Sequence, residues 1–140
     1  MASPIGLQQL AIFEEEGVEP ARVVIGHADS YPNLDYYLEI VRRGAYVQFD
    51  KVGDPKAFYM REDRLINFIL ELIEGGFLQQ ILLSHDTAFP VHLKMMGGIG
   101  YDYMPTRFIP ALLDSGIPQS AIDQLTVHNP RRMLTGANYN

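Results

Sequence analysis

Two segments of the chain each place side chains that can bind a metal ion or move a proton after a short apolar run. In the first, residues 23–26 read Val-Val-Ile-Gly and are followed by His27. In the second, residues 80–83 read Gln-Ile-Leu-Leu and lead through a serine to His85 and Asp86. Imidazole and carboxylate groups bind divalent cations and also act as general acids or bases. The pattern indicates a metal or catalytic site, and the alternatives are a hydrogen-bonded histidine and a loop-bracing aspartate.

A third pair of candidate residues lies between these two segments. Asp50 and Lys51 follow an expected strand at residues 45–49. They form either a surface ion pair or, through Lys51, a contact to a substrate. Because side chains alternate along a strand, His85 and Asp86 cannot both point into the same space. We therefore expect one of those two to pack elsewhere.

The elements that must position these residues alternate between helices and short strands. Apolar spacing predicts helices at 5–16, 34–43, 61–74, 106–115 and 119–124, with a last helical turn from residue 129. The apolar runs predict strands near 22–27, 45–50 and 80–85. Helices between such strands imply right-handed crossovers and a parallel sheet. Active sites in parallel α/β folds lie at the carboxyl ends of the strands, where these candidates fall.

The number of strands predicts part of a larger architecture. A parallel sheet is normally covered on both faces, and three strands make a poor independent sheet. A closed (β/α)₈ barrel takes about 250 residues, whereas this chain has 140. We expect an α/β fold that is the C-terminal part, about three βα units, of a TIM-type (β/α)₈ barrel. Residues 1–140 would form a single partial barrel domain, with the N-terminal half of the barrel absent.

Composition restricts the possible partners. The formal net charge is -6, and no basic stripe is available to bind nucleic acid. The arginine pairs at 42–43 and 131–132 are expected on solvated faces. No apolar run approaches the roughly 20 residues of a membrane span, and no signal-peptide pattern is present. The lack of cysteine excludes thiolate metal sites and fits a cytoplasmic location.

Five stretches, in order, resemble the C-terminal part of phosphotriesterase-like proteins. This group includes phosphotriesterases, lactonases and phosphotriesterase homology proteins, within the amidohydrolase superfamily. The resemblance implies a (β/α)₈ barrel with two divalent cations, usually Zn²⁺, at its C-terminal mouth. The stretches are 8–16 (QQLAIFEEE), 22–29 (RVVIGHAD), 80–86 (QILLSHD), 108–116 (FIPALLDSG) and 127–134 (VHNPRRML).

The resemblance also implies roles for single residues. His27 matches the metal-binding histidine of the sixth strand, and Asp86 matches the metal-binding aspartate of the eighth. Lys51 falls at the end of the seventh strand, where relatives carry histidine or arginine. Ser30 stands where some relatives carry a proton-relay aspartate, and Asp29 lies one position earlier. The family's first-strand histidine pair, carboxylated lysine and fifth-strand histidine have no counterpart in this chain.

The implied activity is hydrolysis of lactone or phosphoester bonds in small molecules by a metal-bridged hydroxide. Asp86 would bind a metal and accept the proton, His27 would bind the second metal, and Lys51 would contact the substrate. A metal site generally needs three or more protein ligands, and this chain offers two. We therefore expect the isolated chain to be inactive unless the missing part is supplied.

Two other function classes remain open. The first is a non-catalytic half-barrel α/β module that associates with itself or another chain. The second is a flavodoxin-like phosphate-binding domain, which is disfavoured because no glycine-rich phosphate loop follows a strand. Open sheet edges promote association. We therefore expect a homo-oligomer from the chain alone, with only weak metal binding.

Overall fold

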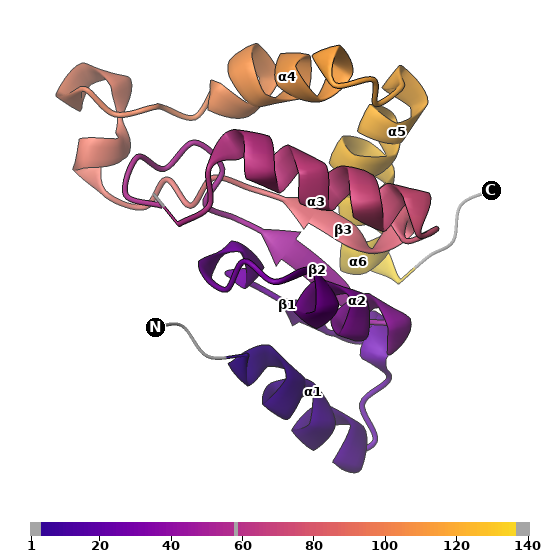
Figure 1. Ribbon diagram of the computed structural model, residues 1–140. Helices are drawn as coiled ribbons and strands as arrows, with labels where there is room; N and C mark the ends of the chain where they lie inside the picture. Colours follow the sequence, from indigo (N-terminus) through magenta and orange to yellow (C-terminus); the bar gives the residue numbers. More distant parts are fainter. Residues whose placement is uncertain (1–3, 58, 137–140) are drawn as a thin grey trace.

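The computed structural model describes residues 4–57 and 59–136, in which three strands form one parallel sheet in the order β1-β2-β3 (Figure 1). The predicted parallel arrangement of helices and strands is confirmed. In chain order, the elements are α1 (Ile5–Glu15), β1 (Val24–Ile25), α2 (Leu34–Arg42), β2 (Tyr46–Phe49), α3 (Glu62–Glu74), β3 (Ile81–Leu83), α4 (Ile109–Asp114), α5 (Gln119–Asp123) and α6 (Asn129–Thr135).

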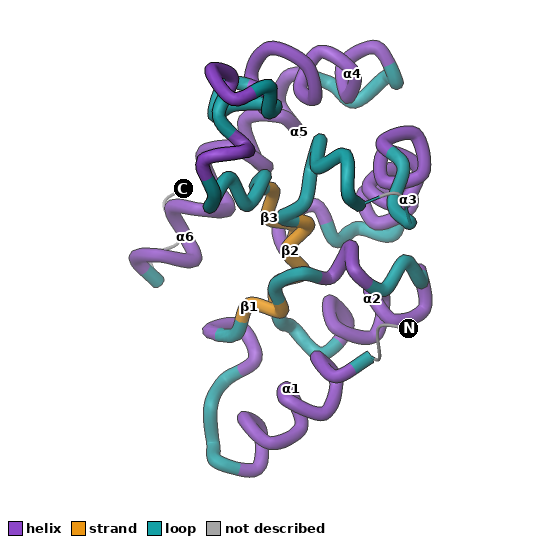
Figure 2. The backbone as a smooth tube through the Cα atoms, turned by 90° about the vertical axis from the view of Figure 1, so that its left-hand side faces the viewer, coloured by secondary structure: helices purple, strands orange, loops and turns teal. Residues whose placement is uncertain are grey.

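One face of the sheet carries most of the core. Ile25, Val47 and Ile81 lie side by side in the parallel register and are all buried. Helices α2 and α3 lie along the same side of the sheet (Figure 2). Tyr37 of α2 meets Phe49 of β2 edge to face, with 5.0 Å between ring centroids. This contact packs the last residue of β2 against α2, and the next two residues are site candidates.

Helix α2 has a clear start and end in the sequence. The side chain of Asn33 accepts a hydrogen bond from the backbone N–H of Tyr36 at 2.9 Å, as an N-cap does. Gly44 follows the helix with a φ of +95°, in the left-handed region that glycine enters without steric cost. The chain therefore turns directly from α2 into β2.

The opposite face of the sheet is less completely covered. Val24 and Gln48 are half-buried there, in the register that they share with Tyr46 and Leu82. The Tyr46 ring is covered by the guanidinium of Arg132 from α6, at 5.5 Å from the ring centroid. This is the face that would point into the interior of a barrel.

Two arginines that were expected on solvated faces instead join elements, so that expectation was wrong for them. Arg43 donates to Glu14 of α1 from Nε at 3.1 Å, and this contact lowers the pKa of Glu14. Arg132 donates to the Tyr46 hydroxyl at 2.9 Å and to the Gln79 side chain at 2.7 Å. Arg43 thus joins the end of α2 to α1, and Arg132 joins α6 to β2 and to the turn before β3.

The C-terminal third is more continuously helical than the apolar spacing indicated. A π-helical turn (Met104–Phe108) runs directly into α4, and a second one (Gln124–His128) joins α5 to α6. Buried Asn129 begins α6 and donates to the backbone carbonyls of Leu78 and Ile81 at 2.8 Å each. These bonds fix α6 against the start of β3.

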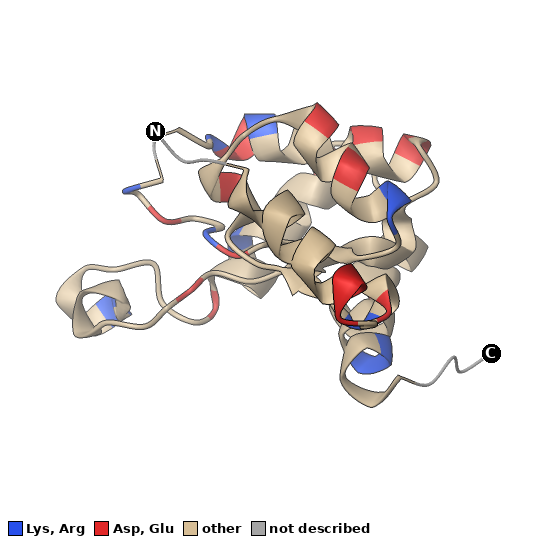
Figure 3. Cartoon of the chain, turned by 90° about the horizontal axis from the view of Figure 1, so that it is seen from below, with Lys and Arg blue, Asp and Glu red and all other residues tan. Residues whose placement is uncertain are grey.

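Charge distribution and helix hydrophobicity are the last two features of the fold. Acidic and basic residues are interspersed along the ribbon, as Figure 3 shows. Among the helices formed by residues 4–57 and 59–136, none has the length and apolar content needed to cross a membrane.

Candidate functional site

All three predicted site residues lie at the edge of the sheet formed by the carboxyl ends of its strands. His27 follows β1, Asp50 and Lys51 follow β2, and Asp86 follows β3. Parallel pairing requires this arrangement, because parallel strands end at the same edge. The site candidates from β1 and β3 are therefore separated by those that follow β2.

His27 is held by the carboxylate of Asp50. The His27 Nδ1 lies 2.6 Å from Asp50 Oδ1, and the His27 backbone N–H donates to Asp50 Oδ2 at 2.9 Å. Asp50 is buried, whereas 60% of the His27 side chain is exposed. His27 also has a φ of +52°, which is uncommon for a residue other than glycine. Asp50 therefore binds both the backbone N–H and the ring of His27.

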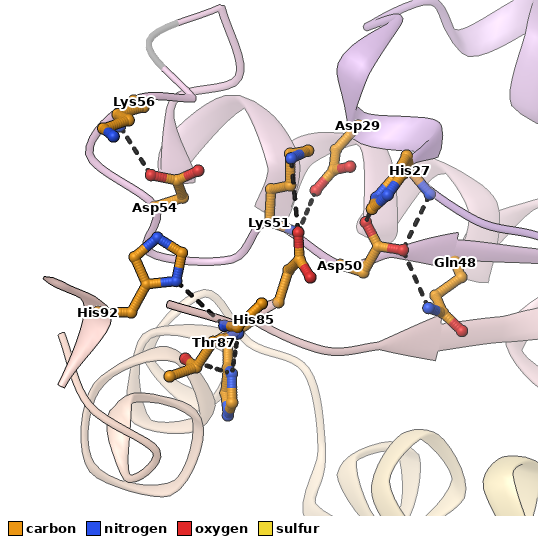
Figure 4. Close-up of polar contacts among 12 residues, drawn as sticks. His27, Asp29, Gln48, Asp50, Lys51, Asp54, Lys56, His85, Thr87 and His92 are labelled. Carbon is orange, nitrogen blue, oxygen red and sulfur yellow. Dashed lines mark hydrogen bonds and ion pairs between the residues drawn. The ribbon is translucent and has the colours of Figure 1, made fainter. Parts of the chain in front are cut away.

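A third donor completes the environment of Asp50. The side-chain amide of Gln48 donates to Asp50 Oδ2 at 3.0 Å, and Figure 4 shows the carboxylate between His27 and Gln48. Gln48 and Asp50 are two positions apart along the chain, so alternation in β2 directs both to the same face. A Cβ atom on Gly26 would lie 3.3 Å from Asp50 Oδ2, which shows how closely the backbone directly after β1 approaches the carboxylate.

Asp29 makes the converse contact, from the segment after β1 to the residue after β2. Its Oδ2 accepts the backbone N–H of Lys51 at 2.7 Å, so the residue after β1 braces the end of β2. Asp29 is only 1% exposed, and burial is the main cause that raises its pKa to about 6. Within the described residues, Asp29 Oδ1 and the Tyr37 hydroxyl are buried without a hydrogen-bond partner.

Lys51 and Asp86 form a loose ion pair, with 3.7 Å between Nζ and Oδ2. Both side chains are partly exposed, at 22% and 42%. The interpretation of Asp50 and Lys51 as a surface ion pair is wrong, because Asp50 is buried against His27 and Lys51 pairs with Asp86 instead. A partly exposed pair of this kind contributes only about 0–1 kcal/mol, so Lys51 can exchange its partner at little cost.

His85 and Asp86 have different surroundings, as strand alternation predicts. His85 Nδ1 lies 2.8 Å from the Thr87 hydroxyl, so this imidazole bonds within its own loop. It also lines a cavity of about 330 Å³ between the loops that follow β2 and β3. Val91, Ile99 and His92 line the same cavity from the second loop. This space lies next to the edge that carries Asp86.

A metal ion would find only part of its ligands here. No group of three or more His, Cys, Asp or Glu side chains lies close enough to hold a metal ion within 4–57 and 59–136. His27 and Asp86 have the chemistry of ligands, because one is an exposed imidazole held through Nδ1 and the other an exposed carboxylate. They fit a metal centre as contributors to it, and two ligands do not complete one.

Two residues in this network were not foreseen from the sequence. Asp50 was considered only with Lys51, and Asp29 only as a neighbour of the relay position. The missed signal was positional, since both carboxylates follow adjacent strands of a parallel sheet. Each can therefore reach the end of the other strand.

Comparisons with known proteins identify one family along nearly the whole chain. A family model described as "Phosphotriesterase family" matches residues 1–134. The phosphotriesterase homology protein of Escherichia coli (strain K12) is 42% identical over 132 residues, which cover 94% of this chain and 44% of that protein. This chain therefore spans less than half of that relative's length.

Solved structures show the same relationship. A crystal structure of the phosphotriesterase homology protein from E. coli, complexed with phosphate in its active site, matches with a TM-score of 0.89 and 39% identity. The match covers 94% of this chain and 44% of that one. A resiniferatoxin-binding protein from Rhodobacter sphaeroides matches with a TM-score of 0.88 and 30% identity, over 96% of this chain and 39% of that one. The structural neighbours are (β/α)₈ barrels, which confirms the fold class of a partial TIM-type barrel.

Proposed function

The chain belongs to the phosphotriesterase family, and from that premise we propose that it forms one side of a metal-dependent hydrolase site for lactone or phosphoester bonds. The observation that carries the proposal is the row of an imidazole, an ammonium and a carboxylate at one edge of the sheet. His27, Lys51 and Asp86 come from three successive strand ends. The remaining ligands would come from other strands of a complete barrel, beyond the three in the described residues.

His27 and Asp86 would hold the metal ions in a complete barrel. Two divalent cations, Zn²⁺ by the family resemblance, would polarise the reacting C=O or P=O bond and lower the pKa of water. Asp86 has an exposed carboxylate, so one oxygen can bind a cation while the other accepts a proton. We therefore assign the catalytic proton transfer to Asp86.

Lys51 is proposed as the substrate contact. Its ammonium lies next to Asp86 in a weak pair, which a substrate oxygen carrying negative charge can replace. A cation placed where charge develops stabilises the transition state more than the bound substrate. A crystal structure of the E. coli relative holds phosphate in its active site, so an anionic ligand in the complete site supports a cationic contact of this kind.

The cavity beside His85 is proposed to hold the part of the substrate that does not react. Its volume of about 330 Å³ suits a small molecule, and Val91 and Ile99 give it apolar walls. Lys56 also lines it and can face an anionic or polar end of the same molecule. A small ester, lactone or phosphoester with an apolar group fits these surroundings.

A non-catalytic half-barrel module is the second candidate. It is favoured by the lack of a three-ligand group among the described residues and by the open edges of β1 and β3. In that case the chain would associate with itself or another chain without needing a metal. Oligomerisation that is unaffected by metal removal would support this candidate.

The test uses a chimera that joins the preceding part of the E. coli relative to this chain. Zinc content is measured by elemental analysis, and hydrolysis is measured with lactone and phosphotriester substrates. His27→Ala and Asp86→Ala should each lose zinc and lower turnover by orders of magnitude, because each removes a ligand. Lys51→Ala should keep zinc and lose turnover.

Matched controls are available on exposed parts of the chain. His128→Ala and Asp114→Ala remove the same side-chain types away from the strand ends and should leave zinc and turnover unchanged. Unchanged zinc in both His27→Ala and Asp86→Ala would rule out their roles as ligands. A folded chimera without zinc and without turnover would favour the non-catalytic module.

A further inference from the structure

We propose that Asp50 is a positioning residue that keeps the hydrogen of the neutral His27 ring on Nδ1 and leaves Nε2 as the metal-binding atom. The inference rests on the proposed function only in that it takes His27 as a ligand. The tautomer of His27 can be measured without metal or substrate.

The hydrogen bonds around Asp50 determine the tautomer. Asp50 Oδ2 accepts from two groups that can only donate, the backbone N–H of His27 and the side-chain NH₂ group of Gln48. Asp50 Oδ1 then faces His27 Nδ1 at 2.6 Å. An ionised carboxylate only accepts hydrogen bonds, so the hydrogen in this contact must come from Nδ1. The lone pair of the neutral ring consequently lies on Nε2.

The same contacts fix the direction of the ring. Asp50 holds the His27 backbone and ring at once, which restricts rotation of the side chain as well as the unusual backbone conformation at φ +52°. Asp50 is buried, while the His27 side chain is 60% exposed. The ring is therefore anchored at Nδ1 by a buried group, and its other nitrogen has no hydrogen bond within the described residues. A carboxylate that orients a metal-binding histidine in this way raises metal affinity.

Asparagine at position 50 should reverse the tautomer. Its single carbonyl oxygen can serve either the two donors at the Oδ2 position or the ring nitrogen, but not both positions. Serving the two donors turns the asparagine NH₂ group toward Nδ1, which must then accept a hydrogen bond. The ring hydrogen would move to Nε2, and the metal-binding lone pair there would be lost. Asp50→Asn changes the shape of the side chain very little, so this effect is chemical rather than steric.

The test is ¹⁵N NMR of the His27 ring in the metal-free 140-residue chain, at a pH where the ring is neutral. The unsubstituted chain should show a protonated Nδ1 and an unprotonated Nε2, and Asp50→Asn should show the reverse. Asp63→Asn is the matched control, because it removes an exposed carboxylate that pairs with Arg61. It should leave the His27 signals unchanged.

Each outcome decides the proposal. A protonated Nε2 in the unsubstituted chain overturns it, and this measurement needs no variant to fold. A backbone amide spectrum checks that Asp50→Asn is folded. A folded Asp50→Asn that keeps its hydrogen on Nδ1 also overturns the proposal.

Zinc titration of the chimera separates this inference from the proposed function. Zn²⁺ should shift the Nε2 signal of His27, and Asp50→Asn should weaken zinc affinity by about 10–100-fold. If Zn²⁺ leaves that signal unchanged in a chimera with Asp50 present, His27 is not a ligand and the proposed function fails. If Zn²⁺ shifts the signal but Asp50→Asn binds zinc equally well, the positioning role fails alone.

Discussion

The two buried aspartates at the strand ends, Asp29 and Asp50, bind different groups. Asp50 fixes a ring that faces solvent, whereas Asp29 fixes a backbone N–H of the neighbouring strand. Both side chains act on a residue after the adjacent strand, so each links two elements. The positions of His27 and Lys51 therefore depend on residues that would not touch a substrate.

Replacement of Asp29 should separate its hydrogen-bonding role from its charge. Asp29→Ala leaves the partly buried N–H of Lys51 without its acceptor and should lower the free energy of unfolding by about 1–3 kcal/mol. Asp29→Asn keeps an oxygen for that N–H and carries no charge into the interior, so it should be clearly more stable than the alanine variant. Urea denaturation measures both variants. Equal losses would show that the acceptor is unimportant.

Single residues were predicted unevenly from the sequence. His27 and Asp86 could be selected because their types and their places after apolar runs are both visible in the chain. Their contacts could not be predicted, because the partner of His27 lies 23 positions away and depends on strand register. The burial of Asp50 was hidden for the same reason, since a polar residue after a strand is usually solvated.

At the scale of elements, the helices and strands follow the apolar spacing closely. The predicted helix at 61–74 is α3 (Glu62–Glu74), and the predicted strand near 45–50 contains β2 (Tyr46–Phe49). The π-helical turns next to α4 and α6 were not predicted, because apolar spacing does not distinguish one extra residue in a helical turn. The burial of Asn129 was likewise not predicted, because an asparagine at the start of a helix is usually exposed.

Asn129 should be the most sensitive polar residue of the C-terminal helices. Its amide donates to two backbone carbonyls that precede or belong to β3, and its Oδ1 accepts from Gln124 at 2.7 Å. Asn129→Ala should cost about 1–3 kcal/mol of unfolding free energy, because buried carbonyls lose their donors. Asn129→Asp should cost more, since a carboxylate would face two carbonyl oxygens. Thermal and urea unfolding would contradict this if aspartate were the milder change.

The contact between the loops that follow β2 and β3 can be tested at Gly53. A Cβ atom at this position would lie 2.6 Å from the Tyr103 ring, and Gly53 has a φ of +77°. Tyr103 donates to Glu62 at 2.8 Å, and burial, followed by this bond, raises its pKa to about 12. Gly53→Ala should therefore displace Tyr103 and weaken the packing of the second loop against α3.

The matched control for this variant is Gly76→Ala. Gly76 also has a positive φ, +87°, but a Cβ atom there would meet nothing within 4 Å. Both variants carry a backbone cost of about 1–2 kcal/mol, and only Gly53→Ala adds the clash with Tyr103. The difference between their unfolding free energies in urea measures the loop contact. Equal losses would mean that Tyr103 moves aside without cost.

At the scale of the whole molecule, the number of strands in the sequence predicts an incomplete barrel. The spatial order β1-β2-β3 leaves one side of β1 and one side of β3 without a strand neighbour in the part of the chain that the structure describes. On the face of the sheet opposite α2 and α3, Val24 and Gln48 are only half-buried. The contact of Arg132 with the Tyr46 ring could not be predicted from the sequence, because it depends on how α6 packs onto the sheet.

Association of the isolated chain follows from these open surfaces. Unpaired strand edges and exposed apolar side chains both promote contacts between copies, so we expect oligomers in size-exclusion chromatography with light scattering. Val24→Lys places a charge on the edge strand and should shift the chain toward the monomer. Ile12→Lys is the matched control, because Ile12 is an exposed apolar residue on α1, away from the sheet. A monomeric unsubstituted chain would contradict the expectation, and loss of oligomers only in Ile12→Lys would move the interface from the sheet to α1.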